Sequence, residues 1–160
     1  MALVKGVNSY ADLTEADTYF ENKLDVAAWT DAAEVQKEQA LCTATSILDE
    51  MVWIGIISSE TQDLAFPRKE AEYFDPKLGT MKSLNSIEVP GRIVNATYEL
   101  AYHLLNNDGL YDDTGMVKNL ELGDIVLETV MPANKTPRIV KSYIKPLLSN
   151  SGARTWWRAN

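Results

Sequence analysis

The segment EVPGRIVNATYELAYHLLNNDG, residues 88 to 109, constrains the fold more than any other part of the chain. Its apolar side chains recur every three or four residues, which is the period of one face of an α-helix. Pro90 lies where the first turn of a helix tolerates proline, and the run from Asn107 to Gly109 is typical of a helix end. The apolar stripe comprises Ile93, Ala96, Thr97, Leu100, Ala101, Leu104 and Leu105. We therefore expect this helix to lie at the centre of the core.

Two helices are expected before this segment. Thr14 has the character of an N-cap residue, followed by carboxylates in the first turn, and predicts a helix that runs to about Lys23. A longer helix is expected to begin at Thr30 and to end near Gly55. Its apolar stripe comprises Val35, Leu41, Ala44, Leu48, Met51 and Val52.

A last helix is expected over TPRIVKSYIKPLL, residues 136 to 148. Thr136 is the expected cap, Pro137 occupies the first turn, and Pro146 should kink or end the helix. The side chains expected to face the core are Val140, Tyr143, Ile144 and Leu147. The basic residues of this helix are Arg138, Lys141 and Lys145, with Lys141 and Lys145 on its outer side. These three residues form a candidate basic interface.

The remaining segments indicate a small amount of β-structure. Residues 64 to 81 contain two prolines, a glycine and short apolar pieces, which favours an irregular loop with a possible hairpin. Residues 116 to 130 alternate in part between apolar and polar side chains, as in one or two half-buried strands. The predicted fold is mainly α with minor β. One helix-rich domain is expected over residues 1 to 148, with an extended C-terminal tail over residues 149 to 160.

Charge is distributed unevenly along the chain, whose formal net charge is −8. All 23 acidic residues lie at or before Glu128, so residues 1 to 128 carry a net −14 and residues 129 to 160 carry +6. This separation favours contact between the basic end and an acidic partner, such as a neighbouring copy of the same chain. An equally good explanation is that the basic end neutralises the acidic body of its own chain.

Few side chains are suited to catalysis or metal binding. Cys42 is the only cysteine and His103 the only histidine, which excludes an internal disulfide and a structural zinc site. Cys42 is expected to be a small buried hydrophobe and His103 a partly buried structural residue. No glycine-rich phosphate loop is present, and residues 106 to 113 have the wrong spacing for a calcium loop. We expect a non-enzymatic protein without a catalytic, cofactor or metal site.

No stretch reaches the 18 or more apolar residues of a membrane span, and the N-terminal apolar run is too short for a signal peptide. The expectation is a protein that is made in the cytoplasm and does not contact a membrane.

The C-terminal sequence SGARTWWRAN combines aromatic and basic side chains. Trp156 and Trp157 lie between Arg154 and Arg158, after a spacer of small polar residues. Tryptophan and arginine are enriched at interface hot spots, which favours docking on another protein. The open alternatives are stacking on nucleic acid and packing of the indoles on the domain's own core.

Several segments together resemble one family of small tailed-bacteriophage proteins. They are NSYADLTEADTYF (8–20), AAW (27–29), KEQALCTATSILDE (37–50), LAFPR (64–68), VPGRIVNATYELAYHLL (89–105) and VKNLELGDIVLE (117–128). Members are often labelled DnaT-like single-stranded DNA-binding proteins, and they are similar to head-to-tail connector, or adaptor, proteins. The resemblance covers roughly residues 7 to 148 and leaves the tail without a counterpart.

For the connector proteins, the resemblance implies a virion protein that forms a ring, commonly of twelve copies, beneath the portal. Such a ring contacts the portal and the tail or nozzle proteins, and packaged double-stranded DNA passes through it without specific binding. For this chain we expect Arg154, Trp156, Trp157 and Arg158 to dock on the portal. The alternative implied by the family label is a DnaT-like replication accessory that binds single-stranded DNA.

Overall fold

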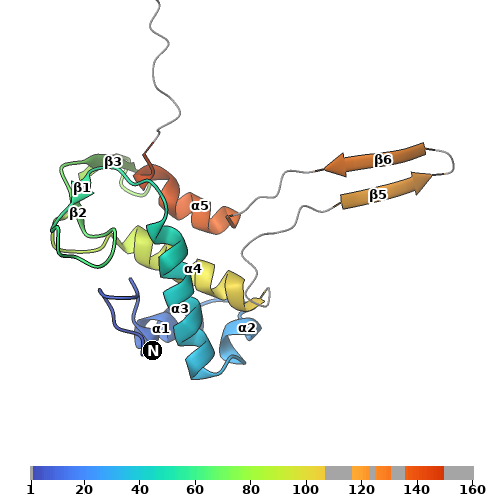
Figure 1. Ribbon diagram of the computed structural model, residues 1–160, viewed down its shortest axis with the longest axis horizontal. Helices are drawn as coiled ribbons and strands as arrows, with labels where there is room; N and C mark the ends of the chain where they lie inside the picture. The colour runs from blue at the N-terminus through green and yellow to red at the C-terminus, as the bar shows by residue number, and fades with distance from the viewer. Residues whose placement is uncertain (1, 107–116, 123–124, 131–135, 150–160) are drawn as a thin grey trace, which may run out of the picture.

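The protein, seen in a computed structural model, is described over residues 2–106, 117–122, 125–130 and 136–149 (Figure 1). Five α-helices and one 3-10 helix occur in these ranges. They are α1 (Leu13–Glu21), α2 (Ala27–Thr30), α3 (Glu34–Asp49), α4 (Gly91–Asn106), α5 (Arg138–Ile144) and η1 (Lys145–Leu147). None of the helices in the described ranges has both the length and the apolar character needed to span a bilayer. The predicted mainly α fold with minor β is confirmed.

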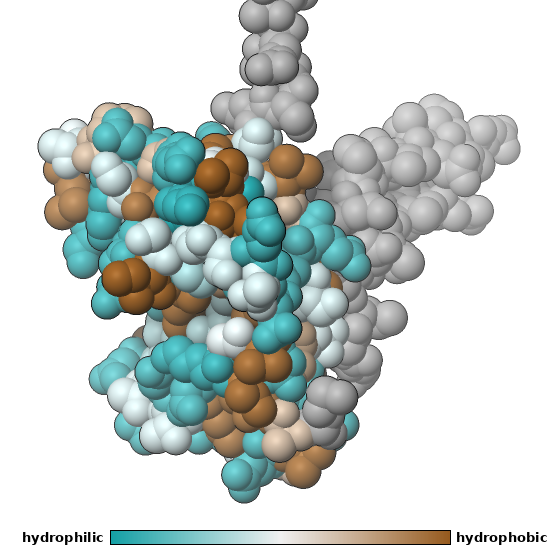
Figure 2. All heavy atoms as spheres, turned by 60° about the vertical axis from the view of Figure 1, so that its left-hand side comes forward, coloured by the Kyte–Doolittle hydropathy of each residue, from teal (hydrophilic) through white to brown (hydrophobic). Residues whose placement is uncertain are grey.

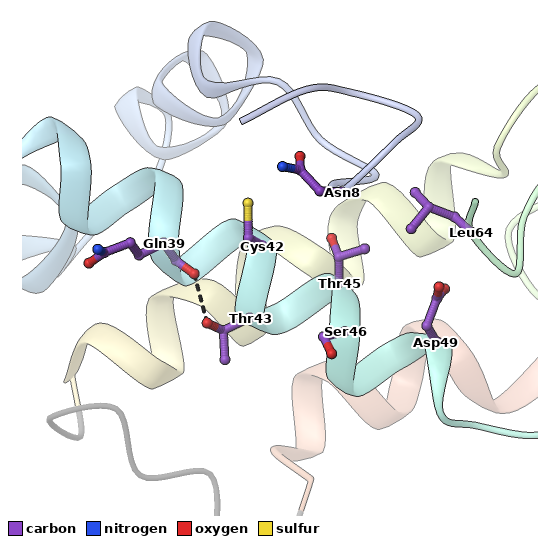
Figure 3. A pocket seen from close by; sticks show the side chains of 8 residues that line it. All are labelled: Asn8, Gln39, Cys42, Thr43, Thr45, Ser46, Asp49 and Leu64. Atoms are coloured by element: carbon purple, nitrogen blue, oxygen red, sulfur yellow. Dashed lines mark hydrogen bonds between the residues drawn. The ribbon is translucent and has the colours of Figure 1, made fainter. Parts of the chain in front are cut away.

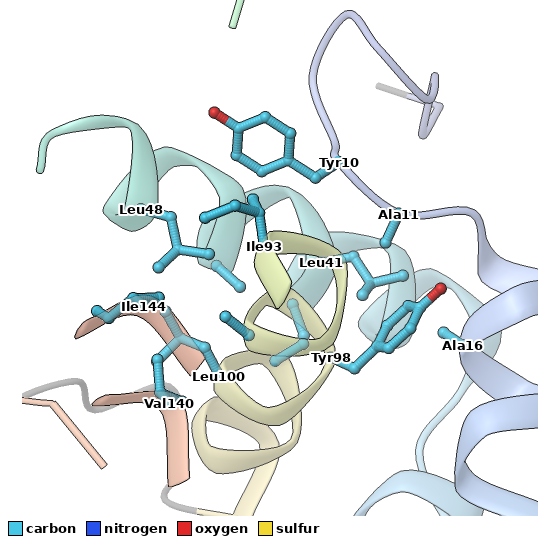
Figure 4. Close-up of a cluster of buried hydrophobic side chains, with 14 of the residues drawn as sticks. Tyr10, Ala11, Ala16, Leu41, Leu48, Ile93, Tyr98, Leu100, Val140 and Ile144 are labelled. Carbon is cyan, nitrogen blue, oxygen red and sulfur yellow. The ribbon is translucent and has the colours of Figure 1, made fainter. Parts of the chain in front are cut away.

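α4 lies at the centre of the helical body, as the sequence predicts. It packs against α2, α3 and α5, and all six residues from 96 to 101 are buried. Six consecutive residues of a helix point in every direction around its axis, so this part of α4 is enclosed on all sides. Figure 4 shows Ile93 and Leu100 of α4 among Leu41 and Leu48 of α3 and Ile144 of α5.

The strands form three separate two-stranded antiparallel sheets. β1 (Ile56–Ile57) pairs with β2 (Arg68–Lys69), β3 (Glu72–Asp75) with β4 (Thr80–Ser83), and β5 (Val117–Leu122) with β6 (Ile125–Val130). The hairpin expected within residues 64 to 81 is therefore present, and the alternating segment near residues 116 to 130 forms two strands. Within β3 the side chains alternate, with Tyr73 buried and Phe74 exposed. Arg92 at the start of α4 ties this hairpin to the body through an ion pair of 3.1 Å with Asp75.

Arg68 organises the irregular segment that contains LAFPR. Its guanidinium donates hydrogen bonds to the carbonyl oxygens of Ile54, Gly55 and Ala65 at 2.8, 2.6 and 3.3 Å. Gly55 has a φ of +71°, and a Cβ atom there would lie 2.5 Å from the carbonyl oxygen of Lys69, so only glycine fits. These contacts replace the regular hydrogen bonds that a loop lacks.

Phe66 of the same segment is buried against two aromatic rings, those of Trp53 and Tyr10, with centroids 5.1 and 6.1 Å away. The peptide bond between Phe66 and Pro67 is cis. Tyr10 donates a hydrogen bond through its hydroxyl to Asp49, and its burial raises the pKa of that hydroxyl. The carboxylate of Asp49 also accepts the backbone N–H of Ala65 at 3.1 Å. LAFPR therefore joins the N-terminal segment to the end of α3.

The expected boundaries of the first two long helices are wrong by several residues. Asp12, not Thr14, caps α1, because its carboxylate accepts the backbone N–H of Thr14 at 2.8 Å. The helix expected to begin at Thr30 begins only at Glu34, because the short α2 ends at Thr30, and α3 ends at Asp49 rather than near Gly55.

The apolar stripe of α3 is consequently shorter than predicted. Leu41, Ala44 and Leu48 are buried, whereas Val35 and Val52 are each 61% exposed. Both exposed valines lie near the ends of α3, where the pattern of apolar spacing continues but the neighbouring helices no longer cover it.

α5 begins one residue later than its predicted cap implies. Pro137 occupies the N-cap position without a side-chain hydrogen bond, so Thr136 is not the cap. Val140, Ile144 and Leu147 are buried as expected, and Tyr143 is half-buried. Near Pro146 the α-helix gives way to the 3-10 turn of η1, which agrees with the predicted ending.

Replacing Ile93 by alanine should lower the free energy of unfolding by about 2–5 kcal/mol, because the lost atoms leave a cavity in the enclosed centre of the core. Urea denaturation followed by circular dichroism measures this difference. Ile87, which is 83% exposed, provides the matched control, and Ile87→Ala should cost less than about 0.5 kcal/mol. Equal losses for the two variants would contradict the central place of α4.

Candidate functional site

The predicted basic interface lies along one side of α5. Arg138, Lys141 and Lys145 are all exposed, and their spacing of three and four residues places them on one helix face. Val140 and Ile144 on the opposite face anchor the helix against the core. The structure thus brings together the three basic residues that the sequence singled out.

An apolar groove runs beside this basic face, between α5 and the end of α3. It has a volume of 520 Å³ and is lined by Glu50, Met51, Val52, Thr136, Lys141, Ile144, Lys145, Leu148 and Ser149. Two backbone hydrogen bonds hold its walls together, from Ile54 to Leu147 at 3.0 Å and from Ser149 to Val52 at 2.9 Å. The groove therefore combines an apolar lining with two lysines and one glutamate, a net positive arrangement that suits an apolar group carried on an anionic partner.

The cations of the rest of the body are largely engaged in contacts within the chain. Residues 2 to 106 contain eight basic and 17 acidic residues. Lys5, Lys23, Lys37 and Arg92 form ion pairs with Glu15, Glu99, Asp17 and Asp75. The guanidinium of Arg68 is occupied by backbone carbonyls. The outer surface of this part of the chain is consequently acidic in balance, and α5 provides its basic counterpart.

The turn between α1 and α2 projects one apolar side chain into solvent. Leu24 is 96% exposed, and the two exposed acidic residues closest to it in sequence are Glu21 and Asp25. Asp25 adopts a left-handed backbone conformation with a φ of +57°, which non-glycine residues rarely do. Its carbonyl oxygen accepts the hydroxyl of Tyr102 of α4 at 2.7 Å. We call residues 21 to 25 the acidic turn.

Lys23 fixes the acidic turn from its other side. Its ammonium forms an ion pair with the buried carboxylate of Glu99, which also accepts the hydroxyl of Tyr19 at 2.5 Å. Burial lowers the pKa of Lys23. The turn is therefore held in a set conformation by two contacts with α4. Sequence reasoning missed this feature because Lys23 and Glu99 are 76 residues apart.

A second hollow, of 440 Å³, lies along α3 beneath the N-terminal segment (Figure 3). Its polar lining is largely committed to internal hydrogen bonds: Thr45 accepts the backbone N–H of Tyr10, and Thr43 donates to the carbonyl of Gln39. Cys42 lines this hollow and is partly exposed, so the expected burial of its side chain is only partial. Burial and the charge of Glu38 raise the pKa of the Cys42 thiol, which reduces its reactivity. This hollow is the weaker candidate for a binding site.

The space-filling view shows how apolar side chains are distributed on one face of the body. In Figure 2 they lie in separate patches between polar residues. Within the described ranges, no three histidine, cysteine, aspartate or glutamate side chains are grouped as a metal site would require. His103 is partly exposed near the end of α4. The proposed portal-docking residues Arg154, Trp156, Trp157 and Arg158 lie outside the described residues.

The fold and these surfaces define a mainly helical domain with a basic helix face, an adjoining apolar groove and a separate acidic turn. The sequence model of one protein family, described as "Putative DnaT-like ssDNA binding protein", matches residues 2–159. The chain belongs to this family. No curated protein and no solved structure matches it.

Replacing Lys23 by methionine should lower the free energy of unfolding by about 1–3 kcal/mol, because it leaves the carboxylate of Glu99 buried without its cationic partner. Urea denaturation measures the loss. Lys77, exposed in the turn between β3 and β4, is the control, and Lys77→Met should leave stability within about 0.5 kcal/mol of the parent. A Lys23 variant as stable as the parent would show that the ion pair does not hold the acidic turn.

Proposed function

We propose that the protein is a non-enzymatic head-to-tail adaptor of a tailed bacteriophage. In this proposal, about twelve copies of the chain assemble as a ring beneath the portal. The observation that carries the proposal is the separation of charge between the acidic body and α5. Resemblance to connector proteins supplies the class of partner.

The acidic body fits the passage of packaged double-stranded DNA. A lumen with negative charge repels the phosphates of a duplex, so DNA can move through without adhering. Residues 2 to 106 carry more than twice as many acidic as basic residues, and most of those basic residues are engaged within the chain. This balance of charge supports the wall of a DNA channel better than a nucleic-acid-binding surface.

The C-terminal tail is the proposed contact with the portal. Residues 154 to 158 place two tryptophans between two arginines, a composition that favours docking in a crevice of another protein. The tail follows Ser149, which lines the groove beside α5, so the tail and the basic face of α5 are neighbours along the chain. In the virion, the opposite side of the ring would contact tail or nozzle proteins.

Replacing Trp156 and Trp157 together by alanine should abolish binding to the purified portal of the same virion while leaving the thermal unfolding midpoint unchanged. Surface plasmon resonance on immobilised portal measures the binding. Phe74→Ala removes an aromatic side chain that is 53% exposed on β3 and serves as the control, with binding retained. Portal binding that survives loss of both tryptophans would contradict the docking role of the tail.

Single-stranded DNA binding is the second candidate function, because the family description names it. The groove beside α5 offers a physical basis. Its apolar lining could receive a base, while Lys141 and Lys145 contact the flanking phosphates. The tryptophans of the tail would add stacking surfaces. The acidic body opposes this role, since it repels a polyanion.

An oligonucleotide titration separates the two functions. The adaptor proposal predicts no measurable binding of a fluorescent single strand at physiological salt. The alternative predicts binding that weakens linearly on a log–log plot against salt and is lost in Lys141→Glu/Lys145→Glu. Lys69→Glu/Lys82→Glu makes the same change of charge away from the groove and should retain such binding. Tight binding with this pattern would replace the adaptor proposal.

A further inference from the structure

We propose that the acidic turn of one copy docks in the groove beside α5 of the next copy, with Leu24 as the apolar anchor. This inference deepens the proposed ring and rests on it, because it names the surfaces through which neighbouring copies meet. The occupant of the groove is thus a second copy of this chain.

The acidic turn has the shape of a preformed knob. Leu24 is 96% exposed, which is the largest exposure among the large hydrophobic side chains of the described residues. The ion pair of Lys23 with Glu99 and the hydrogen bond from Tyr102 to Asp25 hold the backbone on both sides of Leu24. A side chain presented by a fixed backbone loses little conformational entropy when it binds.

The groove matches the knob in both polarity and charge. Met51, Val52, Ile144 and Leu148 provide apolar contacts for one branched side chain. Lys141 and Lys145 line the same groove and outnumber its one carboxylate, Glu50, so they can meet the carboxylates of Glu21 and Asp25 from the other copy. Complementary charges around an apolar anchor are characteristic of specific interfaces.

The knob and the groove lie toward opposite ends of α3, which favours a contact between two copies over a contact within one. The acidic turn precedes α2 near the start of α3, whereas Glu50, Met51 and Val52 follow its end. A helix of 16 residues spans about 24 Å. Figure 1 shows α1 and α2 at one end of the body and α5 toward the other. Two different surfaces that meet between copies make a heterologous contact, which closes a ring when the rotation permits.

Disulfide cross-linking between two variants tests this contact. In a Cys42→Ser background, one protein carries Leu24→Cys and the other Val52→Cys, and the two are mixed and oxidised at the highest soluble concentration. We expect a disulfide-linked dimer that contains one copy of each variant. A chain with both substitutions should give a ladder of higher oligomers. Rising salt should reduce the yield, because the proposed charge pairs are exposed to solvent.

The control mixture pairs Val52→Cys with Ile87→Cys, whose position is also highly exposed. A yield of the mixed Leu24–Val52 dimer no higher than in this control would overturn the proposed contact. So would a predominance of dimers linked through two copies of Leu24→Cys, because they indicate an interface that joins like surfaces.

The result is independent of the portal assay. If the ladder forms but the portal is not bound, the contact stands and the proposed adaptor function fails. If sedimentation velocity shows that the parent chain forms rings but the cross-link does not form, the ring stands and this contact is wrong.

Discussion

Enclosure of α4 on all sides is the constraint on which the rest of the structure depends. A helix buried around its whole circumference cannot leave a charged side chain without a partner, and Glu99 lies in its buried middle. Lys23 supplies that partner, which holds the acidic turn against the body. On another side α4 supports α5, so that its basic face points outward. Both surfaces in the proposed contact between copies are therefore positioned by the same core helix.

The elements predicted well from sequence are those in which a local pattern and the final packing agree. Six of the seven predicted stripe residues of α4 and three of the four inward side chains predicted for α5 are buried, because neighbouring helices cover them, whereas Leu105 and Tyr143 are half-buried. The predicted extent of α3 is wrong because the apolar spacing continues to Val35 and Val52, which neighbouring helices do not cover. The basic face of α5 could be predicted from residue spacing alone. The groove and the acidic turn could not, since they depend on contacts between segments far apart in the chain.

Family membership explains the fold of the chain more directly than its function. LAFPR, one of the most recognisable segments of the resemblance, supplies Phe66 to the core and Arg68 to three backbone carbonyls. Those roles preserve the junction between the N-terminal segment, α3 and the hairpins. A match carried by such residues is compatible with either proposed function, so the distinction depends on surface charge and on the groove.

The two proposed functions compete for the same two lysines. If the acidic turn of a neighbouring copy occupies the groove, Lys141 and Lys145 face carboxylates there and are withdrawn from phosphates. Assembly would then reduce the cationic surface available to DNA and leave the acidic body exposed, which favours a channel that does not retain its cargo. A single strand in the groove would instead block the knob and oppose assembly. Self-association and single-strand binding through this groove should therefore be mutually exclusive, by competition for one site.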